Sequence, residues 1–412
     1  MSGAGSGRDS ISGESGPPVM VVNAGSHSLK LAVLDRDLTV LDESDIDAAP
    51  DSDEVAEGLG EFLDRAPEVA AVGHRIVHGG PRLSAHQVID AQVRSALDEA
   101  RSLAPQHVPP ALAALDLCRR RLPETVQVAC LDTVFHTGLP EAARTYAVPR
   151  EWRNDHGVRR YGFHGLSYAW TLARTAELLS RDPADLQVVL THLGGGSSVC
   201  AVRGGRSVWT SMGFTPLEGL PMSHRSGSVD PGMLLWLQKE KGMSADEVSD
   251  ALEHRSGLLG LSDGLSGDTR ELVRAAGAGH RPASLALEVF GLRVRQEIAA
   301  AAASLDRLDA VVFSGEIGAD QPEVRELVAA GLPVLSVHGG LDTSQDEDHV
   351  ISRGGVPVLV VRPDEQRQLA IEVRRVLEES GGRPAGPAQQ TTPAGAVGTT
   401  PGGTPDDGQH FS

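Results

Sequence analysis

Short apolar runs alternate with glycine-rich turns and amphipathic segments along most of the chain, a pattern typical of α/β proteins. Three apolar runs follow one another within residues 18–44, and the first turn between them reads Asn-Ala-Gly-Ser-His-Ser. The same order returns within residues 188–209, where three glycines and two serines at 194–198 join two apolar runs, and a Gly-Gly pair precedes a third. We therefore predict two units of three strands, each with a small-residue turn after its first strand.

Each of these turns is a candidate phosphate site. Glycine and serine let several backbone N–H groups converge on one point without Cβ atoms in the way, and such a point suits an oligo-anion. A single Gly/Ser turn is more often an ordinary hairpin, whereas two in one layout favour a nucleotide clamped between two domains. The layout resembles the actin, hexokinase and Hsp70 superfamily. That resemblance implies an α/β, two-domain fold with duplicated ribonuclease H-like βββαβαβα units and an active site in the interdomain cleft.

The remaining pattern predicts further strands and helices. Strands are expected at residues 69–80, with Arg75 among apolar neighbours, and at 126–136, where Asp132 follows the apolar run. Helices are expected within residues 47–66, 92–103, 111–122, 159–179, 233–252 and 285–305, followed by a strand, glycine turn and helix at 308–328 and a last strand and closing helix at 356–380.

This order predicts a first domain of residues 19–135 plus 366–380 and a nucleotide-binding second domain of residues 136–365. Residues 1–18 are rich in glycine and serine, and residues 381–412 are rich in proline, glycine and threonine. Neither segment shows hydrophobic periodicity, so we expect both to be disordered tails.

Composition narrows the function. A net charge of −19, with only three lysines, argues against a nucleic-acid or anionic-membrane surface. Cys118, Cys130 and Cys200 lie in apolar contexts without paired spacing, which favours buried thiols over a disulfide or zinc framework. No apolar run approaches the ~20 residues needed to span a membrane, and no signal peptide is recognisable. We expect a soluble cytoplasmic protein with no nucleic-acid or membrane partner.

Nine strings resemble, in the same order, the motifs of one family, the acetate kinases of the acetokinase group, which also contains butyrate and propionate kinases. They are NAGSHSLK (23–30), HRIVHGG (74–80), LAPQH (103–107), LDTVFH (131–136), RRYGFHG (159–165), HLGGGSSV (192–199), GFTPLEGLPMSHRSG (213–227), SGLLGLSDGLSGDTRE (256–271) and SGEIGAD (314–320). The resemblance covers about residues 19–378. It implies reversible, Mg²⁺-dependent transfer of the ATP γ-phosphate to acetate, giving acetyl phosphate and ADP.

The residues themselves suit phosphoryl transfer to a carboxylate. Such an acceptor is already ionised at neutral pH and needs no general base. It needs relief of charge repulsion, in-line positioning and cover for the oxygens of the transferring group. Arg75, beneath an apolar strand, and Arg225, in a small-residue loop, can each hold a carboxylate or a phosphoryl group through a planar guanidinium. Asp132 ends a strand, where a carboxylate can reach Mg²⁺ directly or through water.

The resemblance assigns further roles. It implies a catalytic set of Arg75, Asp132, His164 and Arg225, with His164 and Arg225 stabilising the transition state. Mg²⁺, or Mn²⁺ in its place, would be held near Asn23, Asp132 and Glu365. The substrate would lie against Arg75 and an apolar slot made by Val77, Phe163 and Pro216. ATP or ADP would contact Asn23, Ser26, Ser28, Lys30, His192, Leu193, Gly194, Gly195, Gly196, Ser197, Asp268, Thr269, Arg270, Gly315, Glu316, Ile317, Gly318 and Asp320. His107 matches a further active-site histidine, with a purely structural role equally open, and a homodimer is implied.

Five positions depart from the family pattern. Gln106 replaces a leucine near the substrate methyl, which leaves acetate open against propionate, butyrate or a more polar acid. On the nucleotide side, Gly195 replaces an asparagine, Thr269 a phenylalanine, Glu316 a glycine and Ala319 a glutamate. A side chain at a glycine position can occlude adenosine. Another donor such as pyrophosphate therefore stays open, as does a non-catalytic nucleotide-binding protein, although the retained charged residues favour an enzyme.

Overall fold

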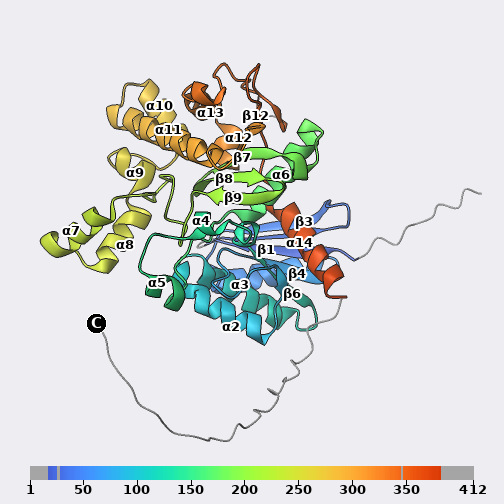
Figure 1. Cartoon of the computed structure of the whole chain (residues 1–412). Coiled ribbons are helices and arrows are strands. Elements are labelled where there is room, and N and C mark those ends of the chain that lie inside the picture. Colours follow the sequence, from blue (N-terminus) through green and yellow to red (C-terminus); the bar gives the residue numbers. More distant parts are fainter. Residues whose placement is uncertain (1–16, 26–27, 345–346, 382–412) are drawn as a thin grey trace, which may run out of the picture.

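Two six-stranded sheets form the framework of the structure, a computed structural model that describes residues 17–25, 28–344 and 347–381 (Figure 1). The first sheet contains β1 (Val19–Ala24), β2 (Leu29–Leu34), β3 (Val40–Ile46), β4 (Ala71–Ile76), β5 (Gln87–Val88) and β6 (Val126–Leu131), in the order β3-β2-β1-β4-β6-β5. The second contains β7 (Gln187–Leu193), β8 (Ser197–Arg203), β9 (Arg206–Thr210), β10 (Ala310–Ser314), β11 (His349–Val350) and β12 (Val358–Val360), in the order β11-β12-β10-β7-β8-β9.

The two sheets repeat one strand plan. In the first, β1 runs antiparallel to β2 and parallel to β4, which is parallel to β6. In the second, β7 runs antiparallel to β8 and parallel to β10, which is parallel to β12. The predicted strand–turn–strand units are therefore equivalent parts of the two sheets, and the predicted duplicated α/β fold is confirmed. Each sheet adds a two-residue antiparallel edge strand, β5 or β11, that is too short to give a periodic signal.

Helices cover both faces of the first sheet. Because side chains alternate along a strand, Val21 packs toward α14 (Glu365–Glu379), whereas Met20 packs toward α1 (Asp53–Arg65) and α3 (Val108–Arg121). α14 approaches closely at Gly73, where a Cβ atom would come within 2.3 Å of the Val373 side chain. The last helix of the chain thus packs on the sheet that contains its first strand. The predicted domain boundaries themselves stay a prediction.

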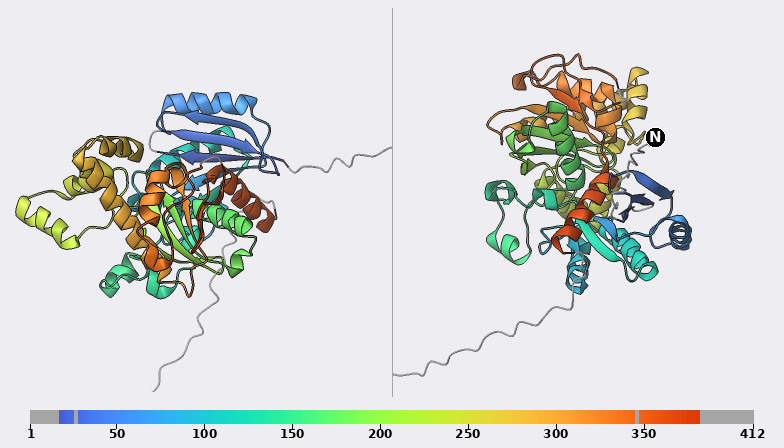
Figure 2. Two further views of the ribbon diagram at one scale, coloured as in Figure 1. Left: turned by 90° about the horizontal axis from the view of Figure 1, so that it is seen from above. Right: turned by 90° about the vertical axis from the view of Figure 1, so that its right-hand side faces the viewer.

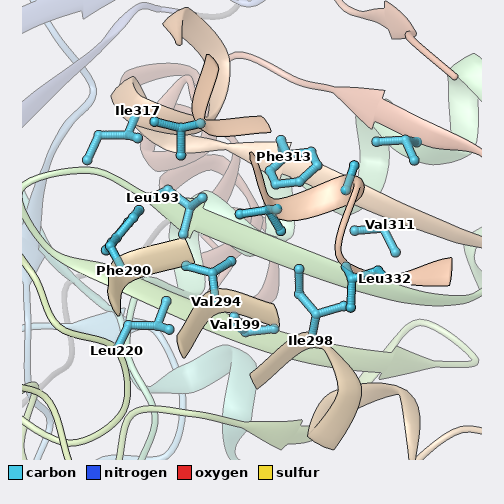
Figure 3. Packing of buried hydrophobic residues seen from close by; sticks show 14 of the residues in the cluster. Leu193, Val199, Leu220, Phe290, Val294, Ile298, Val311, Phe313, Ile317 and Leu332 are labelled. Atoms are coloured by element: carbon cyan, nitrogen blue, oxygen red, sulfur yellow. The ribbon is translucent and has the colours of Figure 1, made fainter. Parts of the chain in front are cut away.

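The second sheet has its main core under α11 (Arg281–Ala302). Phe290, Val294 and Ile298 of this helix meet Val199 of β8 and Val311 of β10, as Figure 3 shows. All five side chains are fully buried. Burying each of them contributes about 1.5–3 kcal/mol relative to leaving it exposed. This apolar layer holds β7 and β10, whose ends carry the site residues, in a rigid sheet.

Helix α6 (Gly165–Leu179) lies between the two sheets. Leu172 packs with Leu190 on the face of the second sheet that α11 leaves open, whereas Leu166, in the first turn, joins the core shared by α14 and the first sheet. The helix that begins directly after His164 is thereby anchored in both cores.

The single helix predicted at residues 233–252 is two helices, α7 (Pro231–Lys241) and α8 (Ala245–His254), which project from the body (Figures 1 and 2). Gly242, with φ of +71°, ends α7 in the left-handed conformation that glycine tolerates. Ser244 then begins α8 through a capping box with Glu247. The prediction overlooked this stop-and-start signal of glycine followed by Ser-x-x-Glu.

The remaining helices are α2 (Ala91–Glu99), α4 (Glu141–Arg144), α5 (Arg150–Asp155), α9 (Gly257–Leu261), α10 (Thr269–Gly277), α12 (Gly315–Asp320) and α13 (Pro322–Ala329), with 3-10 turns at Ala100–Leu103, Val134–His136, Pro183–Asp185 and Pro333–Leu335. The glycine turn predicted after β10 is itself the short helix α12. Within the described ranges, no helix has the length and apolar character required to traverse a bilayer. The tails predicted at residues 1–18 and 381–412 fall almost wholly outside those ranges.

Candidate active site

Residues from both sheets line one cavity of about 800 Å³. It lies at the carboxyl ends of β1, β4, β6, β7 and β10, the side on which open α/β sheets bind ligands. The predicted site residues on its lining are Asn23, Lys30, Arg75, Val77, His107, Asp132, Phe163, His164, His192, Gly194, Gly195, Gly196, Pro216, Arg225, Glu316 and Glu365, and Gln106 is there too. The catalytic, metal and substrate residues predicted from the sequence therefore meet in one place.

Other predicted nucleotide contacts do not line this cavity. They are Ser28, Leu193, Ser197, Asp268, Thr269, Arg270, Gly315, Ile317, Gly318 and Asp320. Leu193 and Ile317 pack in the core of the second sheet (Figure 3), so only their backbone groups can face a ligand. Asp268 and Arg270 form an ion pair with each other at 2.7 Å. Ser26 lies outside the described residues.

Arg75 is the centre of a cluster of polar side chains. Its Nη2 lies 2.8 Å from Oδ2 of Asp132, and its Nη1 lies 2.8 Å from Oε2 of Glu365 and 3.4 Å from Oδ1 of Asn23. Burial alone would lower the pKa of Arg75, but Asp132 and Glu365 outweigh it and hold that pKa above its ordinary range. Burial raises the pKa of Asp132, and the guanidinium opposes this.

Strand register and helix capping bring these side chains together. β4 and β6 are parallel neighbours, and the backbone N–H of Asp132 donates to the carbonyl of Ile76 at 3.0 Å, so Arg75 and Asp132 leave adjacent strand ends. Glu365 is the first residue of α14, whose N-cap is Asp364. Two strand ends and one helix start thus place two carboxylates on a single guanidinium, which leaves this cluster a formal charge of −1.

The cluster fits a divalent cation. Its donors are two carboxylates and the amide oxygen of Asn23, which are the oxygen ligands that Mg²⁺ prefers together with waters. A divalent cation would also offset the excess negative charge. Among the described residues there is no group of three histidine, cysteine, aspartate or glutamate side chains suited to a metal ion. The third protein ligand would therefore be the amide.

His164 and His192 stack beside this cluster. Their ring centroids are 4.2 Å apart with planes inclined by 28°. Burial, followed by the influence of His192 and of Arg75, lowers the pKa of His164 well below its ordinary value. Burial, followed by Arg75, lowers the pKa of His192 to about 4. Both imidazoles are therefore neutral at pH 7, so each ring has one N–H donor and one nitrogen that accepts a hydrogen bond.

Arg225 reaches the cavity from the loop between β9 and α7, in the half of the chain that contains the second sheet. Its Nη2 lies 2.8 Å from Nε2 of His107, which precedes α3 in the half that contains the first sheet. Burial, followed by Arg225, lowers the pKa of His107 to about 3, so the neutral ring accepts a hydrogen bond from the guanidinium. Within the described residues Arg225 makes no salt bridge at 4.0 Å or less. Its charge is therefore available to an anionic ligand.

The glycine turn completes the site. A Cβ atom on Gly196 would lie 3.1 Å from Nε2 of His164 and 3.9 Å from Nη1 of Arg225, so the backbone of this turn passes directly beside both side chains. Gly194 donates its backbone N–H to the Ser197 hydroxyl at 3.2 Å. Among the residues that the structure describes, no other group lies within 4 Å of a Cβ built on Gly195, so the position where the family has asparagine is open there.

Gln106 makes a contact that the sequence did not predict. Its amide nitrogen bonds the Glu253 carboxylate and lies 2.8 Å from Nε2 of His254, both at the end of α8 in the second half. Gln106 still lines the cavity, as expected for a neighbour of the substrate. Its amide is nevertheless directed across the cleft, so this side chain links the two halves of the chain.

Comparison with known proteins identifies the family. A model of the acetokinase family matches residues 52–371, more than half of the chain. The acetate kinase of Deinococcus radiodurans is 45% identical over 327 residues, which cover 78% of this chain and 81% of that protein. The chain belongs to the acetokinase family.

Solved structures agree with membership of the acetokinase family. The crystal structure of Porphyromonas gingivalis acetate kinase has a TM-score of 0.80 at 32% identity, covering 88% of this chain and all of the other. That of a propionate kinase from Francisella tularensis subsp. tularensis SCHU S4 has a TM-score of 0.80 at 31% identity, covering 86% of this chain and 98% of the other. Acetokinases of both names therefore share this fold.

Some residues that shape this acetokinase site were missed from the sequence. The Ser198 hydroxyl contacts His164 from behind and is itself bonded by the Tyr168 hydroxyl, and Ser167 contacts His192. Ser198 stands in the glycine-serine turn already singled out, and Tyr168 follows His164 by one helical turn. That spacing was available as a signal, but it does not reveal which nitrogen of His164 the Ser198 hydroxyl binds.

The backbone at His164 is strained. This residue has φ of +59°, in the left-handed region that non-glycine residues rarely adopt. Its neighbours hold it there, because the carbonyl of Phe163 lies 2.9 Å from Nε2 of His136 and the N–H of Gly165 donates to the carbonyl of Asp132 at 3.0 Å. His164 and Asp132, predicted as a catalytic and a metal residue, are thus linked through one backbone contact.

Replacing Gly165 by alanine is therefore expected to destabilise the protein. An added Cβ atom would lie 2.2 Å from the carbonyl oxygen of Asp132, which belongs to the backbone and cannot move aside cheaply. We expect the free energy of unfolding to fall by about 3 kcal/mol, the upper part of the range for overpacked sites. Denaturant unfolding measures it. Gly138→Ala is the matched control, since nothing lies within 4 Å of its Cβ, and equal stability of both variants would contradict this contact.

Proposed function

We propose that the protein is an acetate kinase that transfers the γ-phosphoryl group of ATP reversibly to acetate, forming acetyl phosphate and ADP. Family membership supports the reaction class, a phosphotransfer to a carboxyl group. The observation that carries the proposal is the meeting of Arg225, His164 and the Gly196 backbone beside the Arg75 cluster. These groups supply charge and hydrogen-bond donors from both halves of the chain to a single point.

The chemistry follows from the charges in the cavity. Acetate is ionised at neutral pH and attacks phosphorus without a general base. Arg225, which lacks a carboxylate partner in the described part of the chain, offsets the repulsion between the two anions. Neutral His164 donates a hydrogen bond to an oxygen of the transferring group, beside the backbone of Gly196. Direct in-line transfer fits this arrangement, because catalysis then depends on positioning and electrostatic stabilisation.

Asn23, Asp132 and Glu365 would hold Mg²⁺, with Mn²⁺ as a substitute. When bound, the metal supplies positive charge to the phosphate oxygens. Arg75 orients both carboxylates and can reach the substrate carboxylate from the same side. Val77, Phe163 and Pro216, all on the lining, give the acetate methyl an apolar wall. Closure of the two halves, to which the Gln106 contact with α8 contributes, would exclude water.

A substrate panel tests this proposal. Initial rates with acetate, propionate and butyrate, each against ATP, GTP and pyrophosphate, should give the highest kcat/KM for acetate with ATP. A higher kcat/KM with propionate would show that propionate is the preferred acceptor, an alternative favoured by the propionate kinase of the same fold. Turnover with pyrophosphate but not with ATP would show that pyrophosphate is the phosphoryl donor. Tight ATP binding without turnover would indicate a non-catalytic nucleotide-binding protein.

Glu316 is expected to weaken ATP binding. It lines the cavity close to the glycine turn, since the Glu316 backbone nitrogen lies 3.8 Å from a Cβ built on Gly194. A carboxylate there repels the phosphates, so Glu316→Gly should lower KM for ATP by about two- to fivefold, the range for a partly screened charge. Glu316→Gln separates the effect of charge from that of side-chain size. This variant loses the charge but keeps the size, so any decrease of its KM for ATP is due to charge. An unchanged KM in both variants would contradict a phosphate path past Glu316.

The quaternary state and location are also proposals. The family resemblance implies a homodimer, and exposed apolar side chains on and before α7 support an interface there; they are Val229, Met233, Leu235 and Trp236. The three cysteines are free and buried, which agrees with a cytoplasmic location. The acidic charge of −19 disfavours nucleic-acid binding. We also propose the domain division at 135/136 and 365/366, which the packing of α14 on the first sheet supports.

A further inference from the structure

His164 is bonded from behind by a buried serine hydroxyl, which is itself bonded by a buried tyrosine hydroxyl. Its Nδ1 lies 2.9 Å from the Ser198 hydroxyl oxygen, and the Tyr168 hydroxyl oxygen lies 2.5 Å from the same Ser198 atom. Tyr168 and Ser198 are both fully buried. Tyr168 stands one turn into α6 and Ser198 is the second residue of β8. A helix and a strand therefore place a chain of three polar groups directly behind the cavity.

The hydrogen bonds that join Tyr168, Ser198 and His164 have one favoured donor-to-acceptor direction. Burial raises the pKa of Tyr168 well above its ordinary value, so its hydroxyl carries a proton. Its described partners are the Ser198 hydroxyl and the backbone of His192, and the His192 contact lowers the pKa of Tyr168, as a donor does. The tyrosine proton is therefore donated to Ser198. Ser198 then donates its own hydrogen to Nδ1 of His164. The reverse direction would leave the buried tyrosine proton without an acceptor, at a cost of about 1–3 kcal/mol.

We propose that Tyr168 and Ser198 are positioning residues that hold neutral His164 in the tautomer with its hydrogen on Nε2, so that this N–H faces the cavity as a ready donor. Nε2 is the nitrogen beside Gly196, where a Cβ would be 3.1 Å away. The catalytic consequence rests on the proposed function, because the donor stabilises the transferring phosphoryl group. The tautomer itself does not depend on that function.

His192 has the same arrangement, which supports the assignment. Its Nδ1 lies 2.7 Å from the buried Ser167 hydroxyl, and a Cβ on Gly194 would be 3.8 Å from its Nε2. Both stacked rings thus turn Nδ1 toward a serine and Nε2 toward the glycine turn. In the opposite tautomer, each Nε2 would present a lone pair to an anionic ligand and repel it.

The test measures the tautomer of His164 and the catalytic rate separately. Long-range ¹H–¹⁵N correlation spectra of the full chain with ¹⁵N-labelled histidine report which nitrogen carries hydrogen, and His164→Gln identifies the signal. We expect the Nε2–H form in the wild type and a shift toward Nδ1–H in Tyr168→Phe and Ser198→Ala. Both variants should lower kcat about tenfold or more with KM unchanged, because a wrong tautomer disables a catalytic histidine. Thr175→Val removes another buried hydroxyl of α6, which donates to the Thr171 carbonyl, and should change neither readout.

Each other outcome is decisive. An Nδ1–H signal in the wild type, or an unchanged tautomer in both variants, would overturn the proposal even if kcat fell. A decrease of kcat in Thr175→Val equal to that in Tyr168→Phe would show a purely structural effect and would also overturn it. If His164→Gln kept full activity while the tautomer behaved as expected, the catalytic role of His164 would be wrong and the tautomer assignment would stand.

Discussion

Replacing Arg225 by alanine is expected to lower kcat about 10³-fold, the scale found for a single charged or hydrogen-bonding group that acts mainly in the transition state. Arg225 brings positive charge to the cavity without a salt-bridge partner among the described residues, whereas Arg75 is shared between Asp132 and Glu365. Without Arg225, the repulsion between acetate and the phosphates has no equivalent compensation. Initial rates of acetyl phosphate formation measure the loss.

The fold should survive this change. The side chain of Arg225 makes one hydrogen bond, to Nε2 of His107, and one distant contact at 3.9 Å, to Sδ of the buried Met222. Thermal unfolding should therefore change little. Arg203→Ala is a suitable control, since this arginine pairs with Asp306 at 3.2 Å on the surface. A kcat within about threefold of the wild type in Arg225→Ala would contradict the electrostatic role assigned to this residue.

Replacing Asp132 by asparagine should have the second largest effect. The change removes the carboxylate that accepts from Arg75 at 2.8 Å and is the most buried of the proposed metal ligands, with 1% of its side chain exposed. Loss of a supporting group already lowers metal affinity or activity by about 10–100-fold, so loss of a direct ligand should lower kcat more than about 100-fold. Mn²⁺ binding followed by electron paramagnetic resonance should weaken in parallel.

Two variants separate the metal role of Asp132 from its structural role. Glu365→Gln removes the other carboxylate and should also weaken Mn²⁺ binding, whereas Asp116→Asn, which loses a 2.8 Å pair with Arg94 on α2, should not. Unchanged Mn²⁺ affinity in a folded Asp132→Asn protein would place the metal elsewhere.

The sequence predicted most of the framework and the charged centre. Arg75 and Asp132 could be placed because each lies at the carboxyl end of an apolar strand. Neighbouring parallel strands bring these ends to one edge of the sheet. The turn at residues 194–196 could be recognised because three successive glycines interrupt the apolar pattern of the two strands beside them. These signals are local in the chain, and the structure brings the three segments to one cavity.

Contacts between distant segments were not readable in this way. Gln106 was expected beside the substrate methyl, but its amide meets Glu253, 147 residues later, on a helix whose start was misplaced. The Tyr168–Ser198 pair is another such contact, joining a helix to a strand 30 residues on. Leu193 and Ile317 looked like ligand contacts from their motifs, yet the burial of their side chains is decided by the α11 core.

The most direct test of the account follows phosphorus by ³¹P NMR in a mixture of the purified full chain, acetate, ATP and Mg²⁺. The account predicts an acetyl phosphate signal that grows together with ADP, converts to a hydroxamate on addition of hydroxylamine, and is lost in Arg225→Ala. Inorganic phosphate and ADP without acetyl phosphate, or no reaction from folded protein with acetate, propionate or butyrate, would contradict it.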